Sequence, residues 1–199
     1  ISFNLEVQND NTAPRVSART VTVEEDGSVT FALSGVDDEG DALTFELTGQ
    51  PRHGTLERVG EQFKYTPAAD FNGEDTVPFI AKDEALSSDA AVLTLVVTPV
   101  NDNPEAKDDS YNLVRATTDV YVLDVLANDS DIDADAVTID GASSSIGTVT
   151  FSDAGLRLQT PATYVGDVSL RYTVTDGHKG RGQATVRVSI TGQAGDGLP

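Results

Sequence analysis

The chain has no cysteine, no methionine and no tryptophan among its 199 residues. Without cysteine it can form neither a disulfide nor a thiolate metal site. With 38% hydrophobic and 6% aromatic residues, its core is modest and must be built mainly from Val, Leu, Ile, Phe and Tyr. In a cytosolic protein the lack of cysteine would be unremarkable, whereas in a secreted β-protein something other than disulfides would have to provide stability, and a bound metal ion is one candidate.

Basic residues are also scarce, since 13 Lys and Arg stand against 33 Asp and Glu, for a net charge of −20. Such a surface repels phosphate, which excludes nucleic acid as a partner and disfavours adhesion to anionic lipid. The carboxylates are either solvated or neutralised by cations. Because self-repulsion at this charge destabilises the compact state, cation binding would act strongly on folding.

Long hydrophobic runs are missing too. The longest, over residues 90–97, is interrupted by Thr94 and has the length of a strand, whereas a membrane-spanning helix needs about 20 apolar residues. We therefore predict no membrane insertion. The sequence shows no signal peptide and begins with Ile1, so we expect it to be a piece of a longer protein.

What the chain does have is alternation of apolar and polar residues in short segments, the pattern of strands with one buried face. Residues 1–7, 43–47 and 91–97 are examples, and turn signals such as Asp26-Gly27 and Gly60 separate them. No segment shows an apolar 3.6-residue period over the length of a helix. About seven short strands in about 90 residues are typical of an antiparallel β-sandwich.

The second half repeats the first at a nearly constant offset. Asp131 lies 94 residues after Asp37, and Asp176 lies 93 residues after Asp83. We therefore predict an all-β fold of two tandem antiparallel Greek-key β-sandwich domains. The predicted divisions are an end strand of a preceding repeat or a leading segment over 1–9, a first repeat over 10–100, a second over 101–192, and a disordered tail over 193–199.

A polar stretch, Val100-Asn101-Asp102-Asn103-Pro104, lies where the two repeats meet. The acidic clusters fall in predicted loops and not along strand faces. In a Greek-key sandwich, the loops that carry Asp131 and Asp176 are expected at the end that faces this stretch. Calcium takes about 6–8 oxygen ligands from carboxylates, carbonyls and Asn side chains. The sequence thus suggests a calcium-dependent linker, although acidic loops are often only solvated turns.

Several strings support a resemblance to a known family. Residues 65–73, 125–131 and 172–177 resemble bacterial cadherin-like repeats, and residues 101–104 resemble the linker motif of cadherins. Such repeats occur in large secreted adhesins and in some extracellular polysaccharide-associated proteins. The resemblance covers nearly the whole chain and implies immunoglobulin-like sandwiches with Ca²⁺ at their junctions.

The resemblance also implies the ligands. At the central junction they would be Glu25, Asn101, Asp102, Asn103, Asp131, Asp133 and Asp176. At the N-terminal junction, the internal repeat gives Asn9, Asp10, Asn11, Asp37, Glu39 and Asp83. We assign Asp41 and Asp135 to loop shaping, and Asp70, Asp75 and Asp129 to turns or the surface. Pro99 stands where animal cadherins have an acid, so we expect fewer calcium ions per junction.

Catalysis is not expected, because His53 and His178 have no counterparts in each other's repeat.

We predict a calcium-stabilised extender or adhesive module of a large extracellular bacterial protein at the cell surface, with neighbouring repeats as partners. One alternative is a carbohydrate-binding module of a polysaccharide-associated protein, which the lack of tryptophan disfavours. Another is a homophilic adhesion module that binds a second copy of itself.

Overall fold

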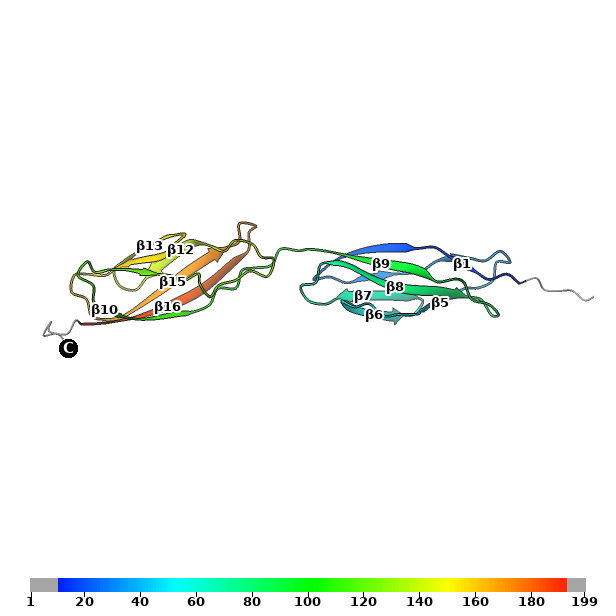
Figure 1. Cartoon of the computed structure of the whole chain (residues 1–199), viewed down its shortest axis with the longest axis horizontal. Helices are drawn as coiled ribbons and strands as arrows, with labels where there is room; N and C mark the ends of the chain where they lie inside the picture. The colour runs from blue at the N-terminus through cyan, green and yellow to red at the C-terminus, as the bar shows by residue number, and fades with distance from the viewer. Residues whose placement is uncertain (1–10, 193–199) are drawn as a thin grey trace, which may run out of the picture. The chain divides into compact units, whose positions relative to one another are not determined.

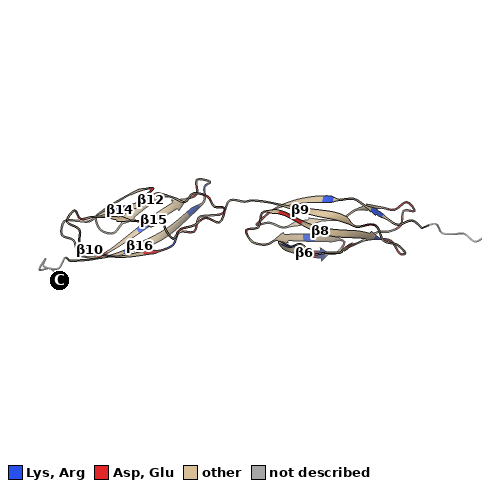
Figure 2. Cartoon of the chain, in the orientation of Figure 1, with Lys and Arg blue, Asp and Glu red and all other residues tan. Residues whose placement is uncertain are grey.

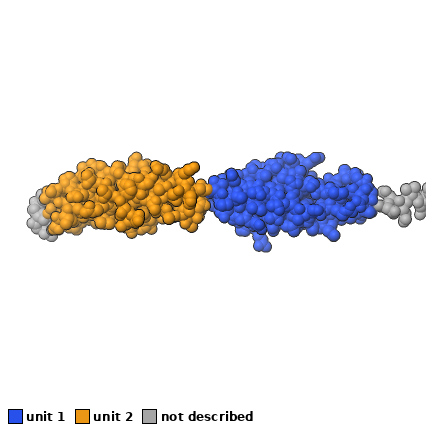
Figure 3. Space-filling model, turned by 90° about the horizontal axis from the view of Figure 1, so that it is seen from above, with its two compact units in different colours: residues 1–100 blue, residues 101–199 orange. Residues whose placement is uncertain are grey.

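The computed structural model describes residues 11–192. The chain divides into two compact units, residues 1–100 and 101–199, which Figure 3 shows in different colours. In the described range the regular elements are β-strands, and no helix there is long and apolar enough to cross a membrane. The predicted end strand over 1–9 and the predicted tail over 193–199 lie outside the described residues.

The first unit is a sandwich of two sheets (Figure 1). The larger has the strand order β2-β9-β8-β5 and the smaller the order β3-β7-β6, with a short β1-β4 pair beside them. The strands are β1 (Arg15–Val16), β2 (Arg19–Glu24), β3 (Val29–Phe31), β4 (Gly35–Val36), β5 (Thr44–Leu47), β6 (Gly54–Val59), β7 (Gln62–Pro67), β8 (Gly73–Lys82) and β9 (Ala91–Thr98).

The second unit repeats this plan. Its sheets have the orders β10-β16-β15-β12 and β11-β14-β13. The strands are β10 (Asp109–Val114), β11 (Val120–Leu123), β12 (Thr138–Ser144), β13 (Thr148–Ser152), β14 (Gly155–Gln159), β15 (Gly166–Thr175) and β16 (Arg181–Thr191). The predicted all-β fold class of two tandem β-sandwich domains is confirmed.

Within residues 11–192, each unit contains one parallel strand pair, between its first long strand and its last. β2 pairs with β9 from Arg19↔Leu93 onwards, and β10 pairs with β16 from Asp109↔Val186 onwards. Leu93 and Val186 are equivalent residues, since they lie 93 positions apart like Asp83 and Asp176. The register therefore makes Asp109 the counterpart of Arg19, so that at the start of each repeat the offset is 90 residues.

The core follows the predicted alternation. On β8 the side chains of Val77, Phe79 and Ala81 are at most 1% exposed, and on β9 Leu93 and Leu95 are fully buried. Burying an aliphatic or aromatic side chain of this size stabilises a fold by about 1.5–3 kcal/mol. The second unit builds its core from β15 and β16 in the same way.

Asp75 corrects one prediction, because it is not a turn or surface residue. It lies within β8 and is only 3% exposed. Its carboxylate accepts the backbone N–H groups of Arg52 at 3.0 Å, His53 at 2.6 Å and Thr76 at 2.9 Å. Burial raises the pKa of Asp75, but the three amides outweigh it and bring the pKa below its usual value. The buried carboxylate thus fastens the turn that precedes β6.

Candidate metal centre in each repeat

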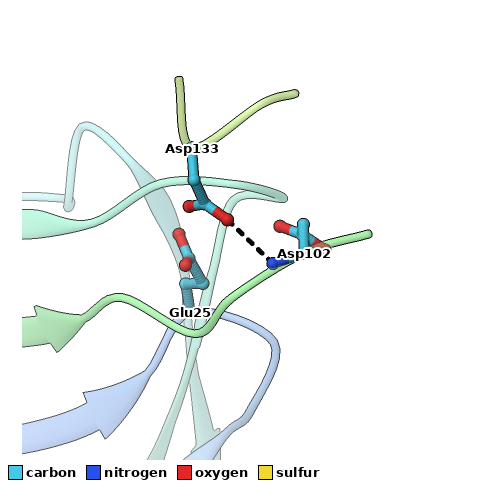
Figure 4. A group of neighbouring side chains, drawn as sticks. All are labelled: Glu25, Asp102 and Asp133. Atoms are coloured by element: carbon cyan, nitrogen blue, oxygen red, sulfur yellow. Dashed lines mark hydrogen bonds between the residues drawn. The ribbon is translucent and has the colours of Figure 1, made fainter. Parts of the chain in front are cut away.

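Most acidic residues of the described range lie in the loops of both units, whereas the strands carry several Lys and Arg residues (Figure 2). In the second unit three of these loops meet. The side-chain amide of Asn101 donates to Asp176 Oδ2 at 2.8 Å, and the backbone N–H of Asp102 donates to Asp133 Oδ2 at 2.8 Å (Figure 4). The linker residues, the acidic loop and the late aspartate therefore come together, as the sequence suggested.

The acidic loop forms a tight carboxylate cluster. The backbone N–H of Asp133 donates to Asp131 Oδ1 at 2.9 Å, and Ala134 adopts a left-handed conformation with φ of 63°. Carboxylate oxygens of Asp131, Asp133 and Asp135 lie within 4.8 Å of one another. Asp135 was expected only to shape the loop, and the structure adds it to the cluster. The alternating Asp-x-Asp-x-Asp pattern is the signal that could have indicated it.

One oxygen in this cluster has no hydrogen-bond donor. Asp131 Oδ2 is buried, and no group in residues 11–192 donates to it. The equivalent oxygen of the first unit, Asp37 Oδ2, is buried and lacks a donor within the same range. Buried carboxylate oxygens without a partner are unfavourable, and this position could hold a cation in both repeats. A divalent ion with oxygen ligands fits this donor set.

Hydrogen bonds from neighbouring groups stabilise the ionised form of the Asp176 carboxylate. It is 5% exposed, and its Oδ1 accepts the backbone N–H groups of His178 at 2.6 Å and Gly180 at 3.0 Å. The side chain of Asn101 lowers the pKa of Asp176 most, and the two amides add to this against the opposing effect of burial. Any side chain at position 180 would collide, since a Cβ there would lie 2.0 Å from Asp176 Oδ2.

Asn103 and His178 lie beside the cluster. The side-chain oxygen of Asn103 accepts the backbone N–H of Arg181 at 3.1 Å, so it joins the linker to the start of β16. His178 Nδ1 lies 2.8 Å from Asp135 Oδ2, which is a contact between a histidine and the acidic loop. His53, in the first unit, stacks on Phe71 with ring centroids 4.2 Å apart.

The first unit repeats these contacts with one change. The side-chain amide of Asn11 donates to Asp83 Oδ2 at 3.2 Å, and the backbone N–H of Thr12 donates to Glu39 Oε2 at 3.2 Å. Asn11 and Thr12 therefore make the contacts that Asn101 and Asp102 make in the second unit, in agreement with the 90-residue offset. Because threonine replaces that aspartate, this cluster has one carboxylate fewer. Asn9 and Asp10 lie outside the described residues.

The loop of the first unit is also crowded with negative charge. Asp37 Oδ1 accepts the backbone N–H groups of Glu39 and Asp41, each at 3.0 Å. The pKa of Asp41 is raised, first by desolvation and then by nearby carboxylates, chiefly those of Asp37 and Asp83. Neighbouring carboxylates that raise the pKa of Asp41 in this way also favour the approach of a cation.

Two consecutive segments of the chain, residues 9–96 and 101–189, match the family model described as bacterial Ig domain. The chain belongs to this family. The two units are accordingly a tandem of bacterial Ig domains, and we call them the first and the second domain from here on.

Known proteins resemble the two bacterial Ig domains at low identity. Integrin beta-like protein B of Dictyostelium discoideum is 27% identical over 121 residues, which is 52% of this chain and 6% of that protein. Human mucin-like protocadherin EC1-2 superposes with a TM-score of 0.59 at 16% identity, covering 90% of this chain and 98% of that one. Drosophila N-cadherin EC1-4 gives 0.58 at 15% identity, over 91% and 50%. These structures show the fold, and the predicted resemblance to tandem cadherin-like repeats is confirmed.

Glu25 occupies a distinctive place in the first bacterial Ig domain. It directly follows β2 and is 3% exposed. Its Oε1 accepts the backbone N–H of Val100 at 2.7 Å, and its Oε2 accepts the side-chain amide of Asn72 at 3.3 Å. The carboxylate thus holds the last residue of the first domain in place.

Proposed function

We propose that this tandem is a calcium-stabilised extender of a larger extracellular bacterial protein, which spaces or presents other domains and has no catalytic role of its own. The observation that carries the proposal is the buried, unpartnered carboxylate oxygen at the equivalent residues Asp37 and Asp131. A solvated turn would leave such an oxygen exposed to water. A repeated orphan oxygen inside an acidic loop is what a cation site requires.

In the second domain the proposed ligands are the carboxylates of Asp131, Asp133, Asp135 and Asp176 together with linker oxygens from Asn101, Asp102 and Asn103. Calcium accepts this number and type of ligand, because its coordination shell is large and flexible. In the first domain the corresponding set is Asp37, Glu39, Asp41 and Asp83, with linker oxygens from Asn11 and Thr12, while the predicted ligands Asn9 and Asp10 align with Pro99 and Val100 at the 90-residue offset. We expect weaker binding there, since Thr12 replaces the carboxylate of Asp102.

The two adjacent linker residues Val100 and Asn101 are each held by a carboxylate. Glu25 holds Val100, and the next residue, Asn101, is held by Asp176. One peptide bond therefore joins a residue fixed by a carboxylate of the first domain to one fixed by a carboxylate of the second. We propose that calcium bound in the second domain neutralises Asp131, Asp133 and Asp176 and so keeps Asn101 fixed at the end of the linker, whereas without calcium these carboxylates repel one another and the contact with Asn101 loosens.

The size of the effect follows from mass action, because a ligand that binds only the folded state stabilises it by RT ln(1 + [L]/Kd). Extracellular calcium modules have Kd values of about 10⁻⁴–10⁻³ M. At ten times Kd the stabilisation is about 1.4 kcal/mol, which raises the melting temperature of a domain of this size by about 6–11 °C.

The test is thermal unfolding of the full chain in EDTA and across a calcium titration, with calorimetry for stoichiometry and affinity. We expect the melting temperature of the second domain to rise with calcium, and Asp131→Ala with Asp133→Ala to abolish that rise. The control, Asp153→Ala with Asp167→Ala, removes the same charge from exposed positions outside the cluster and should retain it. If calcium leaves the wild-type melting temperature unchanged, the proposal is wrong.

A further inference from the structure

The hydroxyl of Tyr172 in the second domain is surrounded by oxygen atoms. The side chain is 1% exposed, and its hydroxyl oxygen lies 3.1 Å from the carbonyl oxygen of Lys107 and 3.0 Å from that of Val125. It also lies 3.0 Å from Asp129 Oδ2 and 3.3 Å from Asp109 Oδ2. A phenol has one proton, and carbonyls and ionised carboxylates only accept. With both carboxylates ionised, only one of these contacts is a hydrogen bond.

A second proton, bound to one of the two carboxylates, supplies the hydrogen-bond donor that is missing. If Asp109 is protonated, its O–H donates to the oxygen of Tyr172, and the Tyr172 O–H donates to Asp129. Asp129 is the better final acceptor because the backbone N–H of Lys107 already donates to it at 2.8 Å. The result is a continuous chain of two hydrogen bonds in a buried setting, where such chains strengthen one another.

We propose that Asp109 is a proton-binding site of the second domain, and that its protonation completes the Asp109–Tyr172–Asp129 chain and stabilises this domain in mildly acidic surroundings. The proposal does not depend on calcium, since none of these three residues belongs to the proposed metal ligands. It assigns to the second domain a response that the first domain lacks.

The charges around Asp109 favour the same state. The ionisable groups nearby are the carboxylates of Glu105, Asp108, Asp124 and Asp129, the phenols of Tyr111 and Tyr172, and the cations Lys107 and Arg187. The two cations are engaged elsewhere, Lys107 with Glu105 at 3.0 Å and Arg187 with Asp108 at 3.8 Å. The pKa of Asp109 is raised to about 6, chiefly by burial; the contact with Tyr172 opposes this, and the carboxylates of Asp129, Asp108 and Asp124 add to it.

The first domain provides an internal comparison. Phe79 is the counterpart of Tyr172, Gly35 of Asp129, and Arg19 of Asp109 by strand register. Without the hydroxyl and the two carboxylates, this place is a cavity of about 280 Å³ whose lining includes all three residues. The excess of acceptors is therefore a property of the second domain, not of the common scaffold.

The direction of the pH effect follows from the pKa. Asp109 binds its proton more tightly in the folded domain, with a pKa of about 6, than in the unfolded chain, where an aspartate has about 3.9. The stabilisation therefore grows as the pH falls through 6, is complete below about pH 4, and is lost as the pH rises above 6. Over that range the folding equilibrium constant of the second domain should change by about 100-fold from this group.

The experiment is calorimetric unfolding of the full chain in EDTA between pH 7.5 and 4.5, for the wild type, Asp109→Asn and Asp108→Asn. Asparagine at 109 is neutral at every pH and still donates to Tyr172, so this variant should lose most of the acid-dependent gain of the second domain. Asp108→Asn is the matched control, because it removes an adjacent acid that does not contact Tyr172; since Asp108 is only a minor cause of the raised pKa of Asp109, this variant should keep most of the gain.

A direct titration keeps the proposal testable if a variant fails to fold. Carbon-13 NMR of the side-chain carboxyl groups in the wild-type chain should show Asp109 titrating near pH 6. A midpoint at or below pH 4, or an Asp109→Asn variant with the wild-type pH profile, would overturn the proposal.

Discussion

Replacing Asp75 by alanine should destabilise the first domain by a predictable amount. The substitution removes three hydrogen bonds from backbone amides to a buried carboxylate, at 3.0, 2.6 and 2.9 Å. Hydrogen bonds to charged groups contribute about 1.5–3 kcal/mol each. Removing the carboxylate also removes the cost of burying it, so we take a net loss of about 3 kcal/mol. For a domain of about 90 residues this lowers the melting temperature by at least about 12 °C.

Calorimetry of the full chain checks this prediction with an internal control. The second domain has Val168 at the equivalent position. There the side-chain oxygen of Ser145 plays the corresponding part, because it accepts the backbone N–H of Ser169 at 2.9 Å. The transition of the second domain should therefore stay where it is. A fall of less than about 4 °C in the first domain, or an equal fall in both domains, would refute the reasoning.

The pH dependence of the same variant gives a second check. The pKa of Asp75 is lowered in the folded domain, so its contribution is fully present above the unfolded value of about 3.9 and is lost as the pH falls through the folded value. The difference in stability between wild type and Asp75→Ala should thus be constant from pH 5 to 8. It should narrow below pH 4, as measured by urea unfolding.

The remaining predictions concern glycine and alanine positions. Gly180→Ala places a Cβ 2.0 Å from Asp176 Oδ2, so calorimetry should show calcium affinity reduced at least tenfold although no carboxylate is lost; unchanged affinity would contradict the proposed role of Asp176. Ala134→Gly relieves a left-handed φ of 63° and should stabilise the second domain by about 1 kcal/mol. Gly40→Ala, at φ of 81° with nothing within 4 Å, should destabilise the first domain by a similar amount, and thermal unfolding that shows the opposite signs would refute both.

Much of the fold could be predicted because the strands alternate and the loops carry turn residues. The sequence also placed Asp131, Asp133 and Asp176 in loops that meet the linker, since a constant repeat offset fixes which loops correspond. Asp135 was missed because an acid in a turn is usually explained by local hydrogen bonding. Its membership of the cluster depends on how Ala134 turns the backbone, which a residue pattern does not specify.

The register of the first strand could not be predicted either. The stretch Asn9-Asp10-Asn11 resembles the central linker in composition, yet Asn11 makes the contacts of Asn101, because the two repeats differ in length between the linker and the acidic loop. The contacts of the Tyr172 hydroxyl could not be predicted for a different reason. Its alternation with polar residues marked it as core, and nothing in that pattern indicates that Asp109 and Asp129, which are distant in sequence, converge on its hydroxyl.

The parallel pairing of the first and last long strands governs how each domain bears tension. The chain enters near the start of β2 or β10 and leaves from the end of β9 or β16, and each pair is aligned over six residue positions. A pull on the two ends therefore slides the paired strands along each other instead of peeling them apart. All the hydrogen bonds of the pair share such a shearing load, so they must break together, whereas a peeled pair would lose them one at a time.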